Sequence, residues 1–379
     1  MGRILSTHTG SLPRPDGLKA LMYEQEEGKP VDRGRLEEAE REAVADVVRR
    51  QAEAGIDIVS DGEMSKPGFV NYVTSRLTGL DGDAPPWTLE DLSQFPELLI
   101  EQYGGEAGAH IVVKSCTGPI TYVGTEAVQR DIEVLKEALA ATPGARSGFL
   151  PAASPGCIAM ACPNHHYGSY EDYLFALARA MRSEYQAIVD ADLLLQIDSP
   201  DLAMAPHTKT WDDAIGRLGL QGYIELHMAA IDEAVAGLDP DRLRTHVCWG
   251  NYTGPHQMDV PLTDVLPGVL AARPRAVSFE AANARHEHEW ADLATMAIPQ
   301  DKVLVPGVID TKTNVLEHPR LVAQRLGHFV DLVGPDRVIG GTDCGFGTFV
   351  GFGAVHPAVA WLKLEALGEG ARLASGQPV

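Results

Sequence analysis

The stretch YEDYLFALARAMRSEYQAIVDADLLLQIDSPD (residues 170–201) contains three patterns in succession. Its first part, Tyr170–Asp190, is amphipathic with apolar residues three and four apart, which predicts a helix. Leu193–Ile197 is a short aliphatic run, and the polar cluster Asp198-Ser199-Pro200-Asp201 follows it directly. This stretch therefore predicts a helix, then a strand, then a polar loop at the strand's carboxyl end.

The same order recurs almost from one end of the chain to the other. Further amphipathic segments are Arg33–Ala54, Gln221–Ala236 and Arg320–Val333. The expected strands are Arg3–Ser6, Ile56–Ser60, His110–Lys114, Gly148–Ala152, Leu193–Ile197, Arg244–Cys248, Ala276–Phe279, Val303–Gly307 and Val338–Gly341. Such alternation of strands and helices is typical of a parallel sheet.

We predict an α/β fold in which residues 1–379 form a single (β/α)8 barrel domain, since no linker rich in Pro, Gly or Ser divides the chain. A barrel needs one strand fewer than the sequence offers. We place His110–Lys114 outside the ring because it follows the irregular stretch Leu80–Gly108, which we interpret as an elaborated loop after strand two. The alternative is a doubly wound sheet, whose first turn usually carries a Gly-rich phosphate fingerprint. No such fingerprint follows the first expected strand.

Polar or special residues follow strand after strand, and this distribution favours the barrel. The clusters are Thr7–Ser11, Asp61–Glu63, Asp198–Asp201, His246–Cys248, Glu280–Asn283, Asp310–Lys312 and Thr342–Cys344. In a barrel the carboxyl ends of all strands meet at one face, where active sites lie. We therefore expect these clusters to converge on one mouth.

Composition narrows the class of partner. The formal charge of −22 argues against a nucleic-acid backbone or an anionic membrane surface as partner, so small molecules are expected instead. The N-terminus has no apolar signal core and no stretch approaches a membrane helix in length, which predicts a cytoplasmic protein. Five cysteines in so long a chain do not indicate a disulfide framework. The oligomeric state is left open, and a homo-oligomer is compatible with the sequence.

One set of residues has the character of a metal site. His246 and Cys248 are two apart in an expected strand, so their side chains point the same way. Cys344 lies in a Gly-rich strand end that leaves its thiol exposed, and Glu280 is available as a fourth group. Thiolates with one imidazole and one carboxylate suit Zn²⁺ better than Mg²⁺, Ca²⁺ or Mn²⁺. We predict that this set binds zinc.

The other candidate ligands lack this context. Cys116 lies in the segment placed outside the ring, and Cys157 and Cys162 are separated by an unusual ligand spacing, so we interpret all three as structural. His286 and His288 stand among charged residues, which predicts a solvated helix start that at most lines the site.

An ordered set of motifs resembles the C-terminal catalytic barrel of the cobalamin-independent methionine synthase family. The motifs are Thr9-Gly10-Ser11-Leu12-Pro13, Asp61-Gly62-Glu63, Gln196-Ile197-Asp198-Ser199-Pro200, His246-Val247-Cys248, Phe279-Glu280, Pro306-Gly307-Val308-Ile309-Asp310 and Asp343-Cys344-Gly345. They run over nearly the whole chain. The family's N-terminal barrel is absent, so the chain resembles a single-barrel relative.

The resemblance implies a function and a role for each matching residue. It implies a zinc-dependent methyl or alkyl transfer in which a zinc-bound thiolate attacks an electrophilic carbon, with zinc on His246, Cys248, Glu280 and Cys344. It implies that Ser11, Glu63 and Asp198 hold the amino-acid part of homocysteine, the two carboxylates taking the ammonium group. Exchange of Glu280 for the substrate thiolate leaves the charge of the zinc site unchanged. Asp310 or Lys312 is then the expected proton donor to the leaving group.

The chain also departs from the family pattern, and the departures leave the alkyl donor open. Ser199 stands where the family has Glu, Lys312 stands where it has His, and no tryptophan lies between Gly148 and Tyr173 to stack a pterin. One alternative is the chemistry of the epoxyalkane:coenzyme M transferases, which are single-barrel zinc relatives. A second alternative is a metal-free barrel resembling uroporphyrinogen decarboxylase, which would need cationic groups instead of the His–Cys…Glu…Cys set.

Overall fold

The computed structural model describes residues 3–84, 88–103, 113–209 and 214–376. Its centre is a sheet of parallel strands in the order β11-β10-β9-β7-β6-β2. Those strands are β2 (Ile58–Ser60), β6 (Ser147–Ala153), β7 (Leu194–Asp198), β9 (Leu243–His246), β10 (Ala276–Phe279) and β11 (Val303–Pro306). Neighbouring strands of this sheet follow the order of the chain, so the central strands wind steadily in one direction. Short outer strands intervene in the sequence between β2 and β6 and between β7 and β9.

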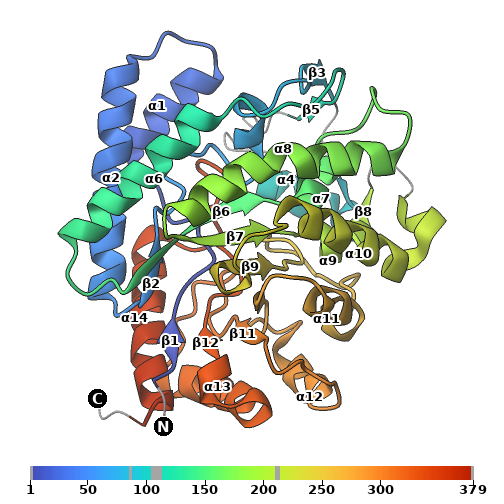
Figure 1. Cartoon of the computed structure of the whole chain (residues 1–379). Coiled ribbons are helices and arrows are strands. Elements are labelled where there is room, and N and C mark those ends of the chain that lie inside the picture. The colour runs from blue at the N-terminus through green and yellow to red at the C-terminus, as the bar shows by residue number, and fades with distance from the viewer. Residues whose placement is uncertain (1–2, 85–87, 104–112, 210–213, 377–379) are drawn as a thin grey trace.

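The sheet curls so that its two edges approach one another. A parallel pair, β1 (Leu5–Ser6) with β12 (Ile339–Gly340), lies between those edges. Parallel bridges join Leu304 to Val338 and Gly307 to Gly341 on the β11 side. On the β2 side, the Asp57 amide donates to the carbonyl of Ser6 at 3.1 Å. The protein is thus an α/β fold built on a curled parallel sheet (Figure 1).

Helices surround this sheet (Figure 1). They are α1 (Asp16–Glu26), α2 (Arg33–Glu53), α3 (Glu90–Ser93), α4 (Pro96–Tyr103), α6 (Thr125–Ala141), α7 (Pro155–Ala161), α8 (Tyr170–Asp190), α9 (Asp201–Met204), α10 (Ala214–Ala234), α11 (Leu262–Ala271), α12 (Trp290–Leu293), α13 (Pro319–Val333) and α14 (Pro357–Ala374). None of those in the described residues has the length and apolar character needed to cross a membrane.

Helix α8 shows why these segments become helices that cover a sheet. The Ser169 side chain accepts a hydrogen bond from the Asp172 amide at 3.0 Å, which caps the first turn. Leu174, Leu177 and Met181, three and four residues apart, are fully buried, and so the apolar face packs inward. The predicted bounds of this helix, Tyr170–Asp190, are confirmed.

The long connection between β2 and β6 forms the elaboration expected after strand two. It contains β3 (Gly82–Asp83), β4 (Thr88–Leu89), α3, α4 and β5 (Lys114–Ser115). Strand β5 pairs antiparallel with β3, apart from the central sheet, as expected for the segment placed outside the ring; residues 110–112 of that segment lie outside the described residues. Strand β4 pairs antiparallel with β8 (Thr208–Lys209), which follows β7. The elaboration therefore reaches back over the carboxyl ends of the strands.

One predicted strand end is wrong in a way that matters for the site. The strand expected to run to Cys248 ends at His246. The Val247 amide still donates to the carbonyl of Ser278, but the Trp249 amide donates to the side chain of Glu280 instead of to a neighbouring strand. Sheet pairing thus stops where a side chain becomes the hydrogen-bond partner, and Cys248 lies in the loop after β9.

Candidate metal centre and active site

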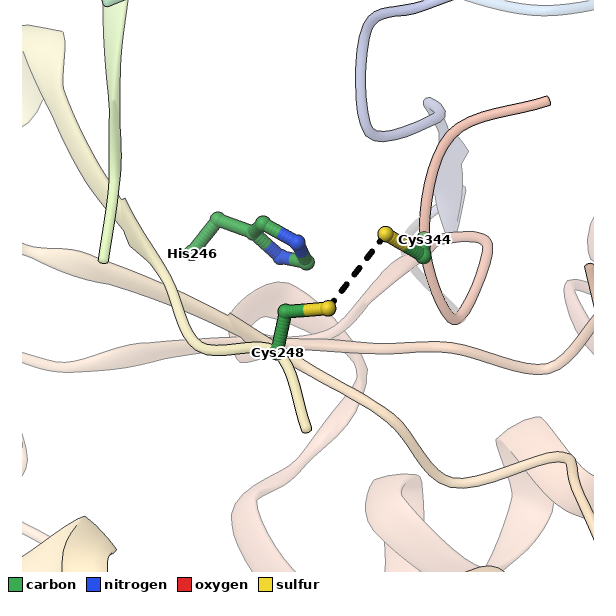
Figure 2. A group of neighbouring side chains, drawn as sticks. All are labelled: His246, Cys248 and Cys344. Carbon is green, nitrogen blue, oxygen red and sulfur yellow. Dashed lines mark hydrogen bonds between the residues drawn. The ribbon is translucent and has the colours of Figure 1, made fainter. Parts of the chain in front are cut away.

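Three predicted ligands come together at the carboxyl ends of β9 and β12. The potential ligand atoms of His246, Cys248 and Cys344 all lie within 4.8 Å of one another, and all three residues are buried. The two sulfurs are 3.4 Å apart, and the His246 imidazole points toward them (Figure 2). Residues nearly a hundred positions apart in sequence therefore form one compact group.

The His246 side chain has the properties of a metal ligand. Neither of its buried ring nitrogens has a hydrogen-bond partner. Burial lowers the pKa of His246 to about 3, so its imidazole is neutral and has a free lone pair. One imidazole and two thiols are a donor set that fits Zn²⁺. The described residues thus satisfy the chemistry of a zinc site.

The two thiols are hydrogen-bonded to each other, and this contact affects the pKa of Cys248. The hydrogen bond with Cys344, followed by burial, raises the pKa of Cys248 well above its ordinary value. The Gly250 amide also donates to the Cys248 sulfur at 3.2 Å. One of these thiols donates a hydrogen bond to the other, and a bound cation would favour the thiolate form of both.

Glu280 lies directly after β10, next to this group but not within it. Its Oε1 accepts from the Trp249 amide at 3.0 Å. Its Oε2 accepts from Asn283 Nδ2 and from Lys312 Nζ, both at 2.7 Å. Burial opposes ionisation of Glu280, but Lys312 and nearby imidazoles outweigh it and keep the pKa of this carboxyl below its usual range. Glu280 is therefore an anion held by three donors.

Asp343 connects the loop of Cys344 to the loop of Glu280, a role that the sequence analysis missed. Its carboxylate accepts from the amides of Ala281, Ala282 and Asn283, each at 2.9 Å. Gly307 makes room for it, because a Cβ there would lie 2.3 Å from an Asp343 oxygen. The acidic residue before Cys344 was the available signal: a buried carboxylate at a strand end needs several donors.

A cavity of about 350 Å³ lies at the carboxyl ends of the strands, and the three predicted metal ligands line it. The predicted substrate residues Ser11, Glu63 and Asp198 line it as well. The other lining residues are Thr9, Phe69, Thr88, Leu89, Pro200, Met204, Gly250, Asn251, Tyr252, Gly345, Thr348, Phe349 and Phe352. Of the polar clusters expected at one mouth, those of Glu280 and of Asp310–Lys312 contribute no lining residue.

Glu63 and Asp198 are buried carboxyls without full compensation. Burial raises the pKa of Glu63 to about 7, and burial together with the nearby Glu63 raises the pKa of Asp198 to about 8. Glu63 Oε2 has no hydrogen-bond partner, whereas Asp198 accepts from Gln196 Nε2 at 2.7 Å. Two such carboxyls facing one cavity provide a site for a cation.

The backbone is specialised to present Glu63. Gly62 and Glu63 both have positive φ, 67° and 58°, and a non-glycine residue there is strained. The Asp61 side chain stabilises the turn by accepting from the Glu63 amide at 3.0 Å. A Cβ on Gly10 would lie 2.8 Å from Glu63 Oε1, so the glycine in the first motif leaves space for this carboxylate.

Ser11 is held against the loop that carries Cys344. A Cβ on Gly345 would lie 1.9 Å from the Ser11 hydroxyl oxygen, so only glycine permits this approach. The Ser11 carbonyl accepts from the Phe346 amide at 2.8 Å. The loops after β1 and β12 are thereby fixed to each other at the cavity wall.

The aromatic part of the cavity wall was also missed by the sequence analysis. Phe69 and Phe349 make an edge-to-face contact with ring centroids 5.5 Å apart, and Phe349 contacts Phe352 in the same way at 6.3 Å. Gly68 and Phe349 form an antiparallel bridge, which brings the loops after β2 and β12 together. The FGTFVGF run (residues 346–352) was the signal, since aromatic residues alternate there with glycines next to a predicted ligand.

The expected proton donors lie in the loop after β11. The Lys312 amide donates to Asp310 Oδ1 at 2.7 Å, so the two residues share one turn. Burial raises the pKa of Asp310. The Lys312 side chain is 9% exposed, and its ammonium group is bonded to Glu280. Glu280 raises the pKa of Lys312 well above its usual range, against the opposing effect of burial.

The interpretation of His286 as part of a solvated helix start is wrong. His286 is buried and bonds to Asp259 at 3.0 Å and to Glu289 at 2.9 Å. Burial opposes protonation, but these two carboxylates raise the pKa of His286 to about 9. Its ring lies against Trp249, the residue after Cys248, with centroids 4.4 Å apart. Two of the acidic residues near His286 are therefore its hydrogen-bond partners inside the protein. His288, by contrast, is exposed.

Comparison with known proteins agrees with this fold and these motifs. Residues 4–90 match the family model described as the catalytic domain of cobalamin-independent synthase. The chain is 26% identical to a methionine synthase of Sulfolobus acidocaldarius over 346 residues, covering 90% of this chain and 85% of the relative. It is 23% identical to a methionine synthase of Saccharolobus solfataricus, covering 97% of this chain and 94% of the relative.

Solved structures share the architecture. A B12-independent methionine synthase from Shewanella sp. W3-18-1 aligns with a TM-score of 0.72 at 20% identity, covering 99% of this chain and 98% of that one. A putative vitamin-B12 independent methionine synthase from Listeria monocytogenes aligns with a TM-score of 0.65, also at 20% identity, with 98% of each chain covered. The expected resemblance is confirmed: residues 4–90 match the catalytic-domain model, and curated methionine synthases align with most of the chain.

Proposed function

We propose that this protein is a zinc-dependent transferase that moves a methyl or alkyl group to the thiol of a homocysteine-like amino acid. One observation carries the proposal: a buried His246–Cys248–Cys344 group and two under-compensated carboxyls, Glu63 and Asp198, line the same cavity. Such a cavity fits a molecule with a soft sulfur and a positive charge. The curated relatives named methionine synthase support the same class of reaction.

His246, Cys248 and Cys344 are proposed as the permanent zinc ligands, and Glu280 as an exchangeable fourth. These residues would hold a zinc ion that would lower the pKa of a ligating thiol and so supply a thiolate nucleophile at neutral pH. Catalytic zinc sites keep three protein ligands and one position open to substrate. The geometry supports this division, because three donors group within 4.8 Å while Glu280 is bonded elsewhere.

Glu63, Asp198 and Ser11 are proposed to orient the amino-acid part of the thiol substrate. An ammonium between Glu63 and Asp198 would remove their mutual repulsion and provide the partner that Glu63 Oε2 lacks. The Shewanella protein that shares this fold was solved in complex with selenomethionine, which is compatible with an amino-acid site. The thiol would then be fixed at both of its ends, which favours attack in one orientation.

The same lining weighs against a coenzyme M-type thiol, the alternative within this chemistry. Its sulfonate would be repelled by Glu63 and Asp198. No lysine or arginine is found among the described residues of the cavity wall, so an anion would lack a partner there. A barrel like that of uroporphyrinogen decarboxylase needs cationic groups for its substrate carboxylates, and the same lining weighs against it.

Asp310 or Lys312 remains the proposed proton donor to the leaving group of the alkyl donor. Both lie in the loop after β11, within one turn of each other, and Lys312 reaches Glu280 beside the ligand group. We also infer that the eight parallel strands close into a (β/α)8 barrel, since β12 pairs with β1 and both neighbours of this pair are hydrogen-bonded to it.

Metal content and thiol binding test the proposal together. We expect one zinc per chain by elemental analysis, and calorimetric binding of homocysteine that is stronger than that of coenzyme M or of 4-mercaptobutanoate, which lacks the ammonium. The Cys116→Ser variant is a matched control because it removes a thiol outside the ligand group. A protein without zinc, or one that prefers coenzyme M, would contradict the proposal.

A further inference from the structure

Lys312 forms the only described ion pair with Glu280, and both side chains are almost completely buried. Lys312 Nζ lies 2.7 Å from Glu280 Oε2, with side-chain exposures of 9% and 0%. Removing one partner of a buried ion pair destabilises the protein strongly, because the other partner is left as an uncompensated buried charge. The carboxylate that is the proposed exchangeable ligand is therefore also the partner of a buried ammonium.

The loop after β11 fixes the Lys312 ammonium in place. The Lys312 amide donates to Asp310 Oδ1 at 2.7 Å, and the Asp310 amide donates to Glu317 Oε1 at 2.9 Å. Lys363, on α14, bonds to the other Glu317 oxygen at 2.8 Å. The position of Lys312 is thus set by a chain of hydrogen bonds that is anchored in a helix, and its side chain then reaches Glu280 from a fixed backbone.

Each Glu280 oxygen accepts at least one hydrogen bond, and Oε2 accepts two. Oε1 accepts from the Trp249 amide, and Oε2 accepts from both Asn283 and Lys312. An oxygen that ligates a metal must direct a lone pair at it, so ligation by Oε2 competes with the bond from Lys312. The ammonium and a metal cation would therefore compete for Oε2, and both would be stabilised by the one negative charge of this carboxylate.

We infer that Lys312 is a positioning residue for Glu280: it binds the Glu280 carboxylate whenever that carboxylate is not a metal ligand, and so keeps the fourth position open to the incoming thiol. This inference rests on the proposed function. In such an exchange, a substrate thiol would lose its proton to solvent, and its sulfur would replace the Glu280 carboxylate on a metal held by His246, Cys248 and Cys344. Glu280 and Lys312 then compensate each other's charge.

Because Lys312 stabilises the Glu280 carboxylate away from the metal, it should also make binding of the substrate thiol more favourable. Without Lys312, a displaced Glu280 would be a buried anion next to a site that has just gained a thiolate. With Lys312, the displaced carboxylate has a partner 2.7 Å away. Lys312 should thus weaken metal binding and strengthen thiol binding, and both effects should act through Glu280.

A double-mutant cycle between Lys312 and Glu280 tests this inference on the zinc-loaded protein. Lys312→Met should tighten zinc binding about tenfold in a chelator competition and weaken homocysteine binding by a similar factor, as expected for a directly coupled pair. Lys312→Arg, which keeps a cation, should restore both values toward those of the parent. In the Glu280→Gln background, Lys312→Met should change neither affinity.

Two results would overturn the inference. One is unchanged zinc and thiol affinity in Lys312→Met. The other is an equal effect of Lys312→Met with and without Glu280→Gln, which would mean that Lys312 acts on the site by its charge alone. If Lys312→Met fails to fold by circular dichroism, Lys312→Gln takes its place in the cycle. A parent protein that binds no zinc or thiol would instead contradict the proposed function itself.

Discussion

Two groups of buried side chains line the same cavity, and each lacks a different partner. In the ligand group, His246 has two ring nitrogens without hydrogen bonds and sits beside two thiols. In the carboxyl group, Glu63 has an oxygen without a partner, and Asp198 has a pKa raised to about 8 by burial and by Glu63. The first group suits a soft metal cation and the second an ammonium. The contrast describes the ligand: a thiol at one end and a positive charge at the other.

The largest effect is expected on zinc affinity when the two thiols of the ligand group are removed. The double change Cys248→Ser and Cys344→Ser should weaken zinc binding on the order of a thousandfold or more, because thiolates supply most of the affinity of such sites. Chelator competition and elemental analysis measure this. The fold should persist by circular dichroism, and Cys116→Ser should keep its zinc; zinc that survived the double change would place the metal elsewhere.

The next largest effect is expected on homocysteine affinity when a carboxyl of the second group is removed and the metal ligands are kept. Asp198→Asn should weaken homocysteine binding roughly 10- to 100-fold, the range for loss of a charged hydrogen bond, without changing zinc content. Calorimetry with 4-mercaptobutanoate is the matched comparison, since that thiol has no ammonium to lose. Equal losses for the two thiols would mean that Asp198 does not contact the ammonium.

The pH dependence of binding distinguishes the groups without mutation. The pKa of Glu63 is raised to about 7 by burial, and that of Asp198 to about 8, so both carboxyls ionise as the pH rises from 6 to 9. An ammonium binds the ionised form, and so homocysteine should gain affinity over this range relative to 4-mercaptobutanoate. The ratio of the two dissociation constants is the measurement, followed up to about pH 8, because only homocysteine has an ammonium for the ionised carboxyls to bind and that ammonium deprotonates at higher pH. A ratio independent of pH would contradict the assignment.

The smallest expected effect is on stability. A carboxyl whose folded pKa is raised holds its proton in the folded state longer than in the unfolded state, so stability falls as the pH rises from about 4 through about 7 for Glu63. Glu63→Gln should therefore raise the melting temperature at pH 8.5 by about 1–3 °C and leave it nearly unchanged at about pH 4, below the window. Differential scanning calorimetry on the substrate-free protein checks both values, and a lower melting temperature at pH 8.5 would be contrary to expectation.

Much of the fold could be predicted because its signals are local. Each strand is a short aliphatic run and each covering helix an amphipathic segment, and in the structure polar clusters do follow the strands. His246, Cys248 and Cys344 could be grouped because parallel strands bring their carboxyl ends to one edge. That inference needed only the order of elements and a parallel sheet.

The rest depends on partners that are distant in sequence. Nothing near Glu280 indicates that Lys312 would bind it, and nothing near His286 indicates burial against Asp259. The end of β9 at His246 follows from a hydrogen bond between the Trp249 amide and Glu280, which no propensity describes. Side-chain pairing across loops sets these features, so the sequence predicts which residues meet at the cavity but not how they pair.

Zinc-edge X-ray absorption of the zinc-loaded protein, with and without homocysteine, tests the central claim most directly. The account predicts two sulfur ligands and one imidazole before homocysteine is added, from Cys248, Cys344 and His246, and three sulfur ligands with the imidazole retained afterwards. A sulfur number that stays at two when homocysteine is saturating would contradict the claim that this site activates the thiol.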